Sequence, residues 1–236
     1  MKREIYMVLV AAGLFLTVSC RKSTPAAPPK STSDSARLMI LLTSPYLPAL
    51  DFFLAYTDTF KVNKAPLAYP GMRQYVSVPS GIQYFYVYLG GTYAGISVSQ
   101  PYDIKPGASY TLMNPTPLDN FGFGRKFMQD DLSLPPDGYA RVRVIQGATY
   151  GGPLDIFIHD GDTLARGVNY NDVTAFLPVK AGSYTFDVRD SQSPYVFKTS
   201  LQATLEAGKN YTLLGKTIPV ADTSRIVVGM DLIENN

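Results

Sequence analysis

The chain repeats itself, and this repeat restricts the possible folds more than any other feature of the sequence. Four pairs of matching motifs carry it: Ala36-Arg37 and Ala140-Arg141, Leu50-Asp51 and Leu154-Asp155, Val78 to Gly81 and Val179 to Gly182, and Pro106 to Leu112 and Ala207 to Leu213. The first two pairs lie 104 residues apart and the last two lie 101 apart, so a small length change falls between them. The repeat predicts two tandem domains, at residues 36–134 and 135–236.

Both copies show the period-two alternation that is typical of strands with one buried face. In the second copy, apolar Tyr184, Phe186 and Val188 alternate with polar Thr185, Asp187 and Arg189, and Val142 and Val144 alternate with Arg141 and Arg143. Gly-, Pro- and Asp-containing turn motifs separate these runs. We therefore predict an all-β protein of two immunoglobulin-like antiparallel β-sandwiches with some seven short strands each. Their last strands are expected near residues 125–132 and 225–233, and no helix is expected outside the N-terminal signal sequence.

The second copy contains an ordered series of motifs from Ala140 to Gly215. It opens with Ala140-Arg-Val-Arg-Val-Ile, continues through Leu154-Asp-Ile-Phe-Ile-His, and closes with Leu205-Glu-Ala-Gly-Lys-Asn-Tyr-Thr-Leu-Leu. This order of motifs resembles a bacterial immunoglobulin-like module, the domain-of-unknown-function family 4397. The resemblance is strong in the second copy and looser in the first. It implies the sandwich fold, and the family has no settled activity.

The composition suits folded domains and excludes one class of partner. Hydrophobic residues make up 46% of the 236-residue chain and charged residues 17%, which is unlike a disordered protein. The formal net charge is only +2, with no basic run or stripe, so a nucleic-acid partner is not expected. No motif suggests a cofactor.

The N-terminus reads as an export and anchoring signal. Lys2 and Arg3 precede a short apolar run, which indicates a signal peptide over residues 1–19. Cys20, the single cysteine of the chain, follows this run directly and resembles the lipid-modified cysteine of a bacterial lipoprotein. Thr17 stands where most such signals have Leu, and the alternative is an ordinary signal peptide with an incidental cysteine. Residues 20–35 are Pro- and Ser-rich and predict a flexible tether.

These features place the protein in a Bacteroidota-type cell envelope, lipid-anchored to the outer membrane on the periplasmic face or at the cell surface. Arg21 and Lys22 slightly favour the periplasmic face, because surface-exported lipoproteins of that phylum often carry an acidic run after the cysteine.

Few polar residues could support catalysis, and we expect no enzyme activity and no catalytic residues. His159 is the sole histidine, so a two-histidine metal site is impossible, and no Gly-x-Ser-x-Gly motif surrounds any serine. Asp51 and Asp155 occupy equivalent positions in the two copies. They could be calcium ligands, but acceptors for loop backbone N–H groups are the favoured interpretation, so no metal site is predicted.

The first copy departs from the second at one row of residues. Where the second copy has Thr185, Asp187 and Arg189 on the outward face of a strand, the first has Tyr84, Tyr86 and Tyr88. Three tyrosines on a nominally wet face suit an interface or stacking against sugars. The alternative is that they pack on the second domain, on the Phe121-Gly-Phe123 segment, or stay exposed as good strand residues.

The sequence therefore predicts a non-enzymatic envelope lipoprotein for adhesion, or for binding a glycan or an envelope protein through Tyr84, Tyr86 and Tyr88. The alternative function is a structural or accessory subunit of an envelope protein complex.

Overall fold

The computed structural model describes residues 34–56, 59–114, 125–148, 151–192, 197–219 and 227–235. The predicted signal peptide, Cys20, nearly all of the tether and the Phe121-Gly-Phe123 segment lie outside these ranges. Every regular element within them is a β-strand, which confirms the all-β class. No helix in the described ranges is long and apolar enough to cross a membrane.

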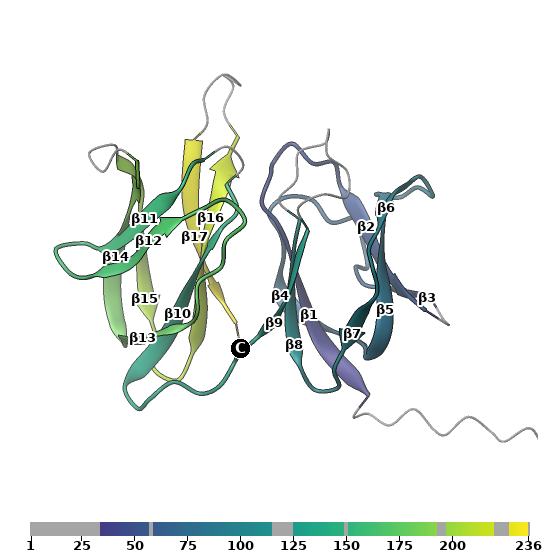
Figure 1. The fold of residues 1–236 in the computed structure, drawn as a ribbon, viewed down its shortest axis with the longest axis horizontal. Coiled ribbons are helices and arrows are strands. Elements are labelled where there is room, and N and C mark those ends of the chain that lie inside the picture. The colour runs from purple at the N-terminus through teal and green to yellow at the C-terminus, as the bar shows by residue number, and fades with distance from the viewer. Residues whose placement is uncertain are drawn as a thin grey trace, which may run out of the picture. The chain divides into compact units, whose positions relative to one another are not determined.

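The first copy forms a sandwich of two sheets, with strand orders β4-β1-β8-β9 and β3-β2-β5-β6, and with β7 paired to β5 (Figure 1). The strands are β1 (Ser35–Leu42), β2 (Leu50–Ala55), β3 (Thr59–Lys61), β4 (Gly71–Pro79), β5 (Gly81–Leu89), β6 (Gly95–Val98), β7 (Tyr102–Ile104), β8 (Ser109–Asn114) and β9 (Lys126–Asp130). Leu38, Phe52 and Phe85 are fully buried between the sheets.

The second copy repeats this plan with strand orders β13-β10-β16-β17 and β12-β11-β14-β15. The strands are β10 (Tyr139–Gln146), β11 (Leu154–Ile158), β12 (Thr163–Val168), β13 (Leu177–Lys180), β14 (Gly182–Asp190), β15 (Phe197–Leu205), β16 (Asn210–Ile218) and β17 (Val227–Glu234). Its own core contains Val142, Ile156 and Phe186. The boundary predicted at residues 134–135 falls in the loop between β9 and β10.

One pair of strands in each copy is parallel, which the prediction of antiparallel sheets did not include. β1 pairs with β8, and β10 pairs with β16, both in parallel register. A parallel pair cannot be closed by a hairpin and needs a long connection. Here the chain crosses into the other sheet of the sandwich and returns before the pair forms. The alternation of apolar and polar residues indicates which face of a sheet a residue occupies. It does not indicate whether a strand that is distant in the sequence pairs in parallel or antiparallel.

Matching hydrogen bonds recur at equivalent positions of the two copies. The Tyr110 hydroxyl accepts the backbone N–H of Lys105 at 2.9 Å, and the Tyr211 hydroxyl accepts that of Glu206 at 3.2 Å. Both donors and both acceptors are related by the shift of 101 residues. Each bond ties the turn before a strand to a buried tyrosine ring within that strand.

A third apolar cluster joins the two copies. It is built from fully buried side chains on the outer faces of the two sheets that contain β1 and β10: Met39, Leu41, Met113, Ile145, Leu214 and Ile233. Arg143, which alternation had suggested for a polar face, is also buried there. The period-two pattern was right about the inward face of β10, with Val142 and Val144 buried. Its other face is covered because a second sheet packs on it.

Candidate binding face on the first sandwich

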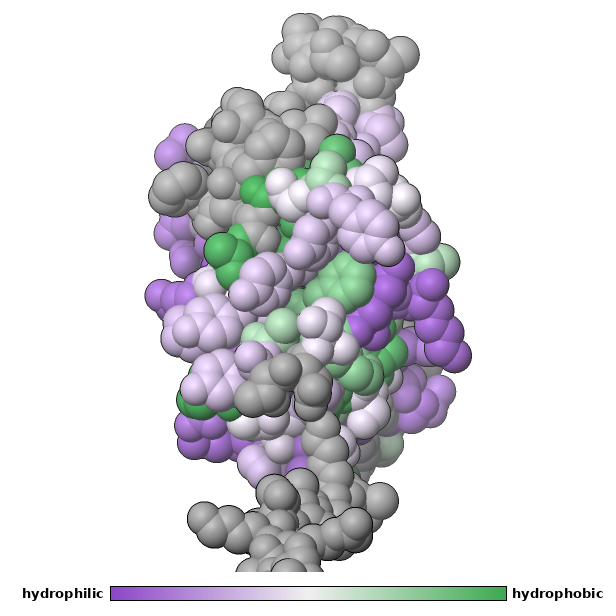
Figure 2. Space-filling view, turned by 90° about the vertical axis from the view of Figure 1, so that its right-hand side faces the viewer, coloured by the Kyte–Doolittle hydropathy of each residue, from purple (hydrophilic) through white to green (hydrophobic). Residues whose placement is uncertain are grey.

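The three predicted tyrosines lie on the outer face of the sheet β3-β2-β5-β6. Phe85 and Val87, which alternate with them along β5, are fully buried in the sandwich core. Tyr84, Tyr86 and Tyr88 therefore point outward and are half-buried. In Figure 2, side chains of near-neutral and apolar colour occupy the middle of this side of the molecule, and strongly hydrophilic ones gather toward its margins.

The register of β2 against β5 adds a second row of side chains to this face. Phe53 lies opposite Tyr86, and Ala55 lies opposite Tyr84. The rings of Phe53 and Tyr88 meet edge to face, with centroids 5.3 Å apart and an interplanar angle of 84°. At the other end of the strand, the rings of Tyr56 and Tyr84 are nearly parallel, at 10° and 6.4 Å.

Two aromatic side chains contributed by loops stand clear of the sheet. Tyr56, directly after β2, is 65% exposed, and Tyr93, in the turn between β5 and β6, is 98% exposed. Tyrosine combines an apolar ring with a polar hydroxyl and is enriched at interfaces, and contiguous exposed apolar surface marks binding sites. We call the six residues Phe53, Tyr56, Tyr84, Tyr86, Tyr88 and Tyr93 the aromatic face.

The aromatic face contains a hollow of about 290 Å³. Its lining combines four aromatic residues with two small ones: Phe53, Tyr86, Tyr88, Tyr93, Ala55 and Thr59. Ala55 and Thr59 leave room because their side chains are short. This volume lies at the small end of the range for ligand pockets, which is ~300–1,000 Å³. The hollow fits one ring-sized group of a ligand.

An ion pair borders the aromatic face without giving it a net charge. Lys61 Nζ lies 3.0 Å from Asp51 Oδ1 and 5.6 Å from the centroid of Phe53. The second oxygen of Asp51 accepts the N–H of Gly91 at 2.9 Å. Burial works to raise the pKa of Asp51, but this hydrogen bond and Lys61 together hold it below its ordinary value.

Asp51 accepts a backbone N–H group from the turn between β5 and β6, which agrees with the favoured interpretation, whereas Asp155 accepts one from within strand β12. Asp155 Oδ1 accepts the N–H of Gly167 at 2.7 Å, just as Asp51 accepts that of Gly91. Asn63 also donates to Asp51 at 3.0 Å. Among the residues that the structure describes, no group of three His, Cys, Asp or Glu side chains could hold a metal ion.

The equivalent face of the second sandwich has a different chemistry. Phe157, the counterpart of Phe53, lies under two guanidinium groups, those of Arg189 at 5.0 Å and Arg166 at 5.5 Å. Asp187, the counterpart of Tyr86, was expected on a solvated face but is only 6% exposed. It is covered because it lies between His159 and the Phe157–Arg189 stack. Two guanidinium groups thus cap Phe157, whereas Phe53 in the first copy has only the Lys61 ammonium group near its ring, at 5.6 Å.

His159 directly follows β11 and begins the hairpin turn of residues 159–162, with Asp160 at a positive φ of 53°. Its Nδ1 lies 2.8 Å from Asp187 Oδ2. This hydrogen bond, together with the charges of Asp160 and Asp187, raises the pKa of His159. The ring is exposed, and its two nitrogens lie next to the carboxylates of Asp160 and Asp187 rather than a serine hydroxyl.

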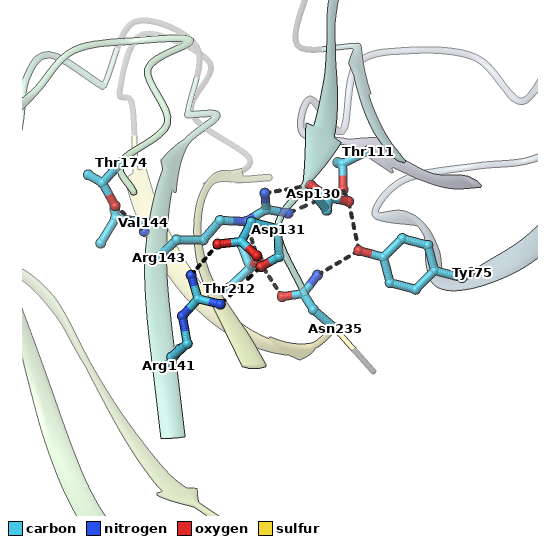
Figure 3. Close-up of polar contacts among 10 residues, drawn as sticks. All are labelled: Tyr75, Thr111, Asp130, Asp131, Arg141, Arg143, Val144, Thr174, Thr212 and Asn235. Atoms are coloured by element: carbon cyan, nitrogen blue, oxygen red, sulfur yellow. Dashed lines mark hydrogen bonds and ion pairs between the residues drawn. The ribbon is translucent and has the colours of Figure 1, made fainter. Parts of the chain in front are cut away.

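A buried polar network was missed by the sequence analysis (Figure 3). Arg143 Nη1 on β10 donates to Asp130 Oδ1 on β9 at 2.6 Å, and Tyr75 and Thr111 donate to Asp130 Oδ2 at 2.7 and 2.6 Å. Burial, with the charge of Asp130, raises the pKa of Tyr75 well above its ordinary range. Both oxygens of the carboxylate are occupied and buried, so the network joins the two copies and offers no access to a substrate.

Comparison with known proteins decides the family. A family model described as a domain of unknown function (DUF4397) matches residues 36–157 and 142–228. The chain belongs to this family. The two overlapping DUF4397 matches agree with the tandem organisation. No curated protein matches the sequence.

Solved structures resemble this DUF4397 protein only distantly. The Bacillus anthracis TIE protein is 16% identical, with a TM-score of 0.25, over 78% of this chain and 33% of that one. The present chain thus spans about a third of its length. The family 26 carbohydrate-binding module of Eubacterium rectale Amy13K, in complex with maltoheptaose, is 8% identical, with a TM-score of 0.27, over 85% and 97%. The tip fimbrial protein Mfa3 of Porphyromonas gingivalis is also 8% identical, with a TM-score of 0.24, over 85% and 99%.

Proposed function

We propose that this protein is a non-enzymatic, lipid-anchored binding protein of a Bacteroidota-type envelope, and that the aromatic face binds a glycan. The observation that carries this proposal is the hollow lined by Phe53, Tyr86, Tyr88 and Tyr93 on the outer face of a sheet. No catalytic role is assigned to His159, because its ring nitrogens face carboxylates in an exposed turn.

The chemistry of the aromatic face favours a neutral sugar. A tyrosine offers an apolar ring on which the C–H face of a sugar can stack, and a hydroxyl that can bond to sugar hydroxyls. The ion pair of Lys61 and Asp51 at its border leaves no unbalanced charge to attract an acidic ligand. Pockets that combine aromatic walls with a few polar groups are typical of small-ligand sites.

A glycan array with neutral and acidic glycans tests this proposal. The chain carrying Tyr84→Ser, Tyr86→Ser and Tyr88→Ser is expected to lose the binding of neutral glycans that the unchanged chain shows. Tyr139→Ser is the matched control, since Tyr139 is an exposed tyrosine of the second copy. Thermal unfolding of both variants separates lost binding from lost folding. Absence of neutral-glycan binding by the unchanged chain refutes the proposal.

We propose that a lipid anchor is attached to Cys20, because this cysteine directly follows the apolar run of the predicted signal peptide. Several acyl chains on one residue hold a protein stably at a membrane, where a single chain does not. We place the protein at the outer membrane, on its periplasmic face or at the cell surface. Cys20→Ala is expected to move the protein from the membrane fraction to the soluble one. Unchanged fractionation of the variant would count against lipidation.

A second candidate function is that of an accessory subunit of an envelope complex. The high solvent exposure of Tyr56 and Tyr93 favours this accessory role, because aromatic residues are enriched at protein interfaces. Crosslinking in intact cells, followed by affinity purification, distinguishes the two functions. A stable protein partner that is lost on replacement of Tyr84, Tyr86 and Tyr88 would favour the accessory role over glycan binding.

A further inference from the structure

The aromatic face has two places where a ring could stack. One is Tyr88, at one end of the row of tyrosines, where it lines the hollow that also reaches Ala55 and Thr59. The nearly parallel rings of Tyr56 and Tyr84 lie at the other end, and neither residue lines the hollow.

The row of tyrosines is longer than one sugar ring. Tyr84 and Tyr88 are four residues apart on the same strand, which corresponds to ~14 Å at a rise of ~3.4 Å per residue. A single pyranose stacked on Tyr88 would leave the Tyr56–Tyr84 pair without a contact. Several linked sugars lying along β5 would reach both.

The intervening surface suits such a chain. Tyr86 lines the hollow and lies between Tyr84 and Tyr88, and its outward position follows from the burial of Phe85 and Val87 on either side. Ala55, opposite Tyr84, also lines the hollow and is too small to block a ligand that runs along the strand. Tyr93, in the turn after β5, lines the hollow as well.

We propose that the aromatic face binds a linear, neutral oligosaccharide of at least three sugars along β5. One sugar occupies the hollow, and a second, non-adjacent sugar stacks on the Tyr56–Tyr84 platform. This inference rests on the proposed glycan-binding function and specifies the form of the ligand.

Isothermal titration calorimetry with chains of increasing length tests this inference. The probes are linear oligomers of glucose, mannose, galactose and N-acetylglucosamine, each from one to six units. For the oligomer series that binds, the affinity is expected to rise at least tenfold between one and about four units, and then to level off. Tyr56→Ser should reduce this gain several-fold, whereas the control Tyr139→Ser, outside the aromatic face, should leave the affinity for every length unchanged. Tyr88→Ser should weaken the binding of every length.

The outcomes separate the inference from the function on which it rests. Binding that is equally strong for all lengths, or a length gain unaffected by Tyr56→Ser, overturns the extended site but leaves glycan binding in place. No binding of any neutral oligomer overturns both. Tyr56 is largely exposed, so its replacement is expected to leave the fold intact, and Tyr84→Ser, checked by thermal unfolding, tests the same platform independently.

Discussion

Arg143 and Asp130 form an ion pair across the two sandwiches, with 2.6 Å between Nη1 and Oδ1 and side chains that are 3% and 0% exposed. Two residues away along β10, Arg141 pairs with Asp131 at the same distance of 2.6 Å, but Asp131 is 66% exposed. The same two residue types thus form one buried and one solvated pair within a few residues of each other.

Replacing Arg143 should cost far more stability than replacing Arg141. Arg143→Met leaves the Asp130 carboxylate buried without its cation, and breaking such a pair typically costs about 3–5 kcal/mol. Arg141→Met removes a pair whose carboxylate is solvated, which is worth about 0–1 kcal/mol. Urea unfolding of the two variants measures the difference. Equal losses would show that burial at this interface does not control the strength of the pair.

His159 should titrate above the ordinary value of histidine, which is about 6.5. Because its pKa is raised in the folded chain, its pairing with Asp187 stabilises the fold below the unfolded value and is lost as the pH rises through the folded one. Asp187→Asn should lower the pKa of His159. The chain has one histidine, so its NMR resonances can be followed without assignment. An unchanged titration in the variant would contradict this role of Asp187.

Asp51 should stabilise the first sandwich at neutral pH and less so in acid. Its pKa is lowered in the folded chain, so the contribution is present above the unfolded value of about 3.9 and is lost as the pH falls through the folded one. Asp51→Asn is expected to lower the melting temperature at pH 7 by more than it does near pH 3. Asp103→Asn, at a half-exposed carboxylate, is the control. A difference independent of pH would contradict this prediction.

Tyr110→Phe and Tyr211→Phe should destabilise the chain by similar amounts. Each removes a hydroxyl that accepts a backbone N–H in the same turn of its copy, a bond worth about 0.5–1.5 kcal/mol. Chemical denaturation of both variants, with Tyr139→Phe as a surface control, measures the losses. A large loss in one copy alone would show that the two bonds have diverged in their contribution.

The sequence was sufficient to predict which side chains of a strand face the core. It was insufficient to predict what covers the outward faces. Alternation identified Phe85, Val87, Phe186 and Val188 as core residues, and all four are buried. It did not predict the burial of Arg143. A period of two distinguishes the two faces of a strand, but it does not indicate whether a second sheet covers the outward face. One signal was available: the run Leu38 to Leu42 is apolar at both parities, which is typical of a strand buried on both faces.

The candidate site was predicted in part. Comparing the copies singled out Tyr84, Tyr86 and Tyr88, because they replace polar residues at matched positions on one strand. Phe53 could not be added, since its place opposite Tyr86 depends on the register of β2 against β5. Tyr56 and Tyr93 come from loops, whose course local patterns do not determine.

The apolar cluster that contains Met39, Leu41, Ile145 and Leu214 bears on how the chain can be divided. Cut between β9 and β10, each fragment would expose one side of that cluster to water, together with either Arg143 or Asp130 unpaired. A fragment of one copy would therefore be prone to self-association. Although the repeat reads as two modules, its halves are expected to fold and unfold in a single cooperative transition, so any ligand held on the first copy also stabilises the second.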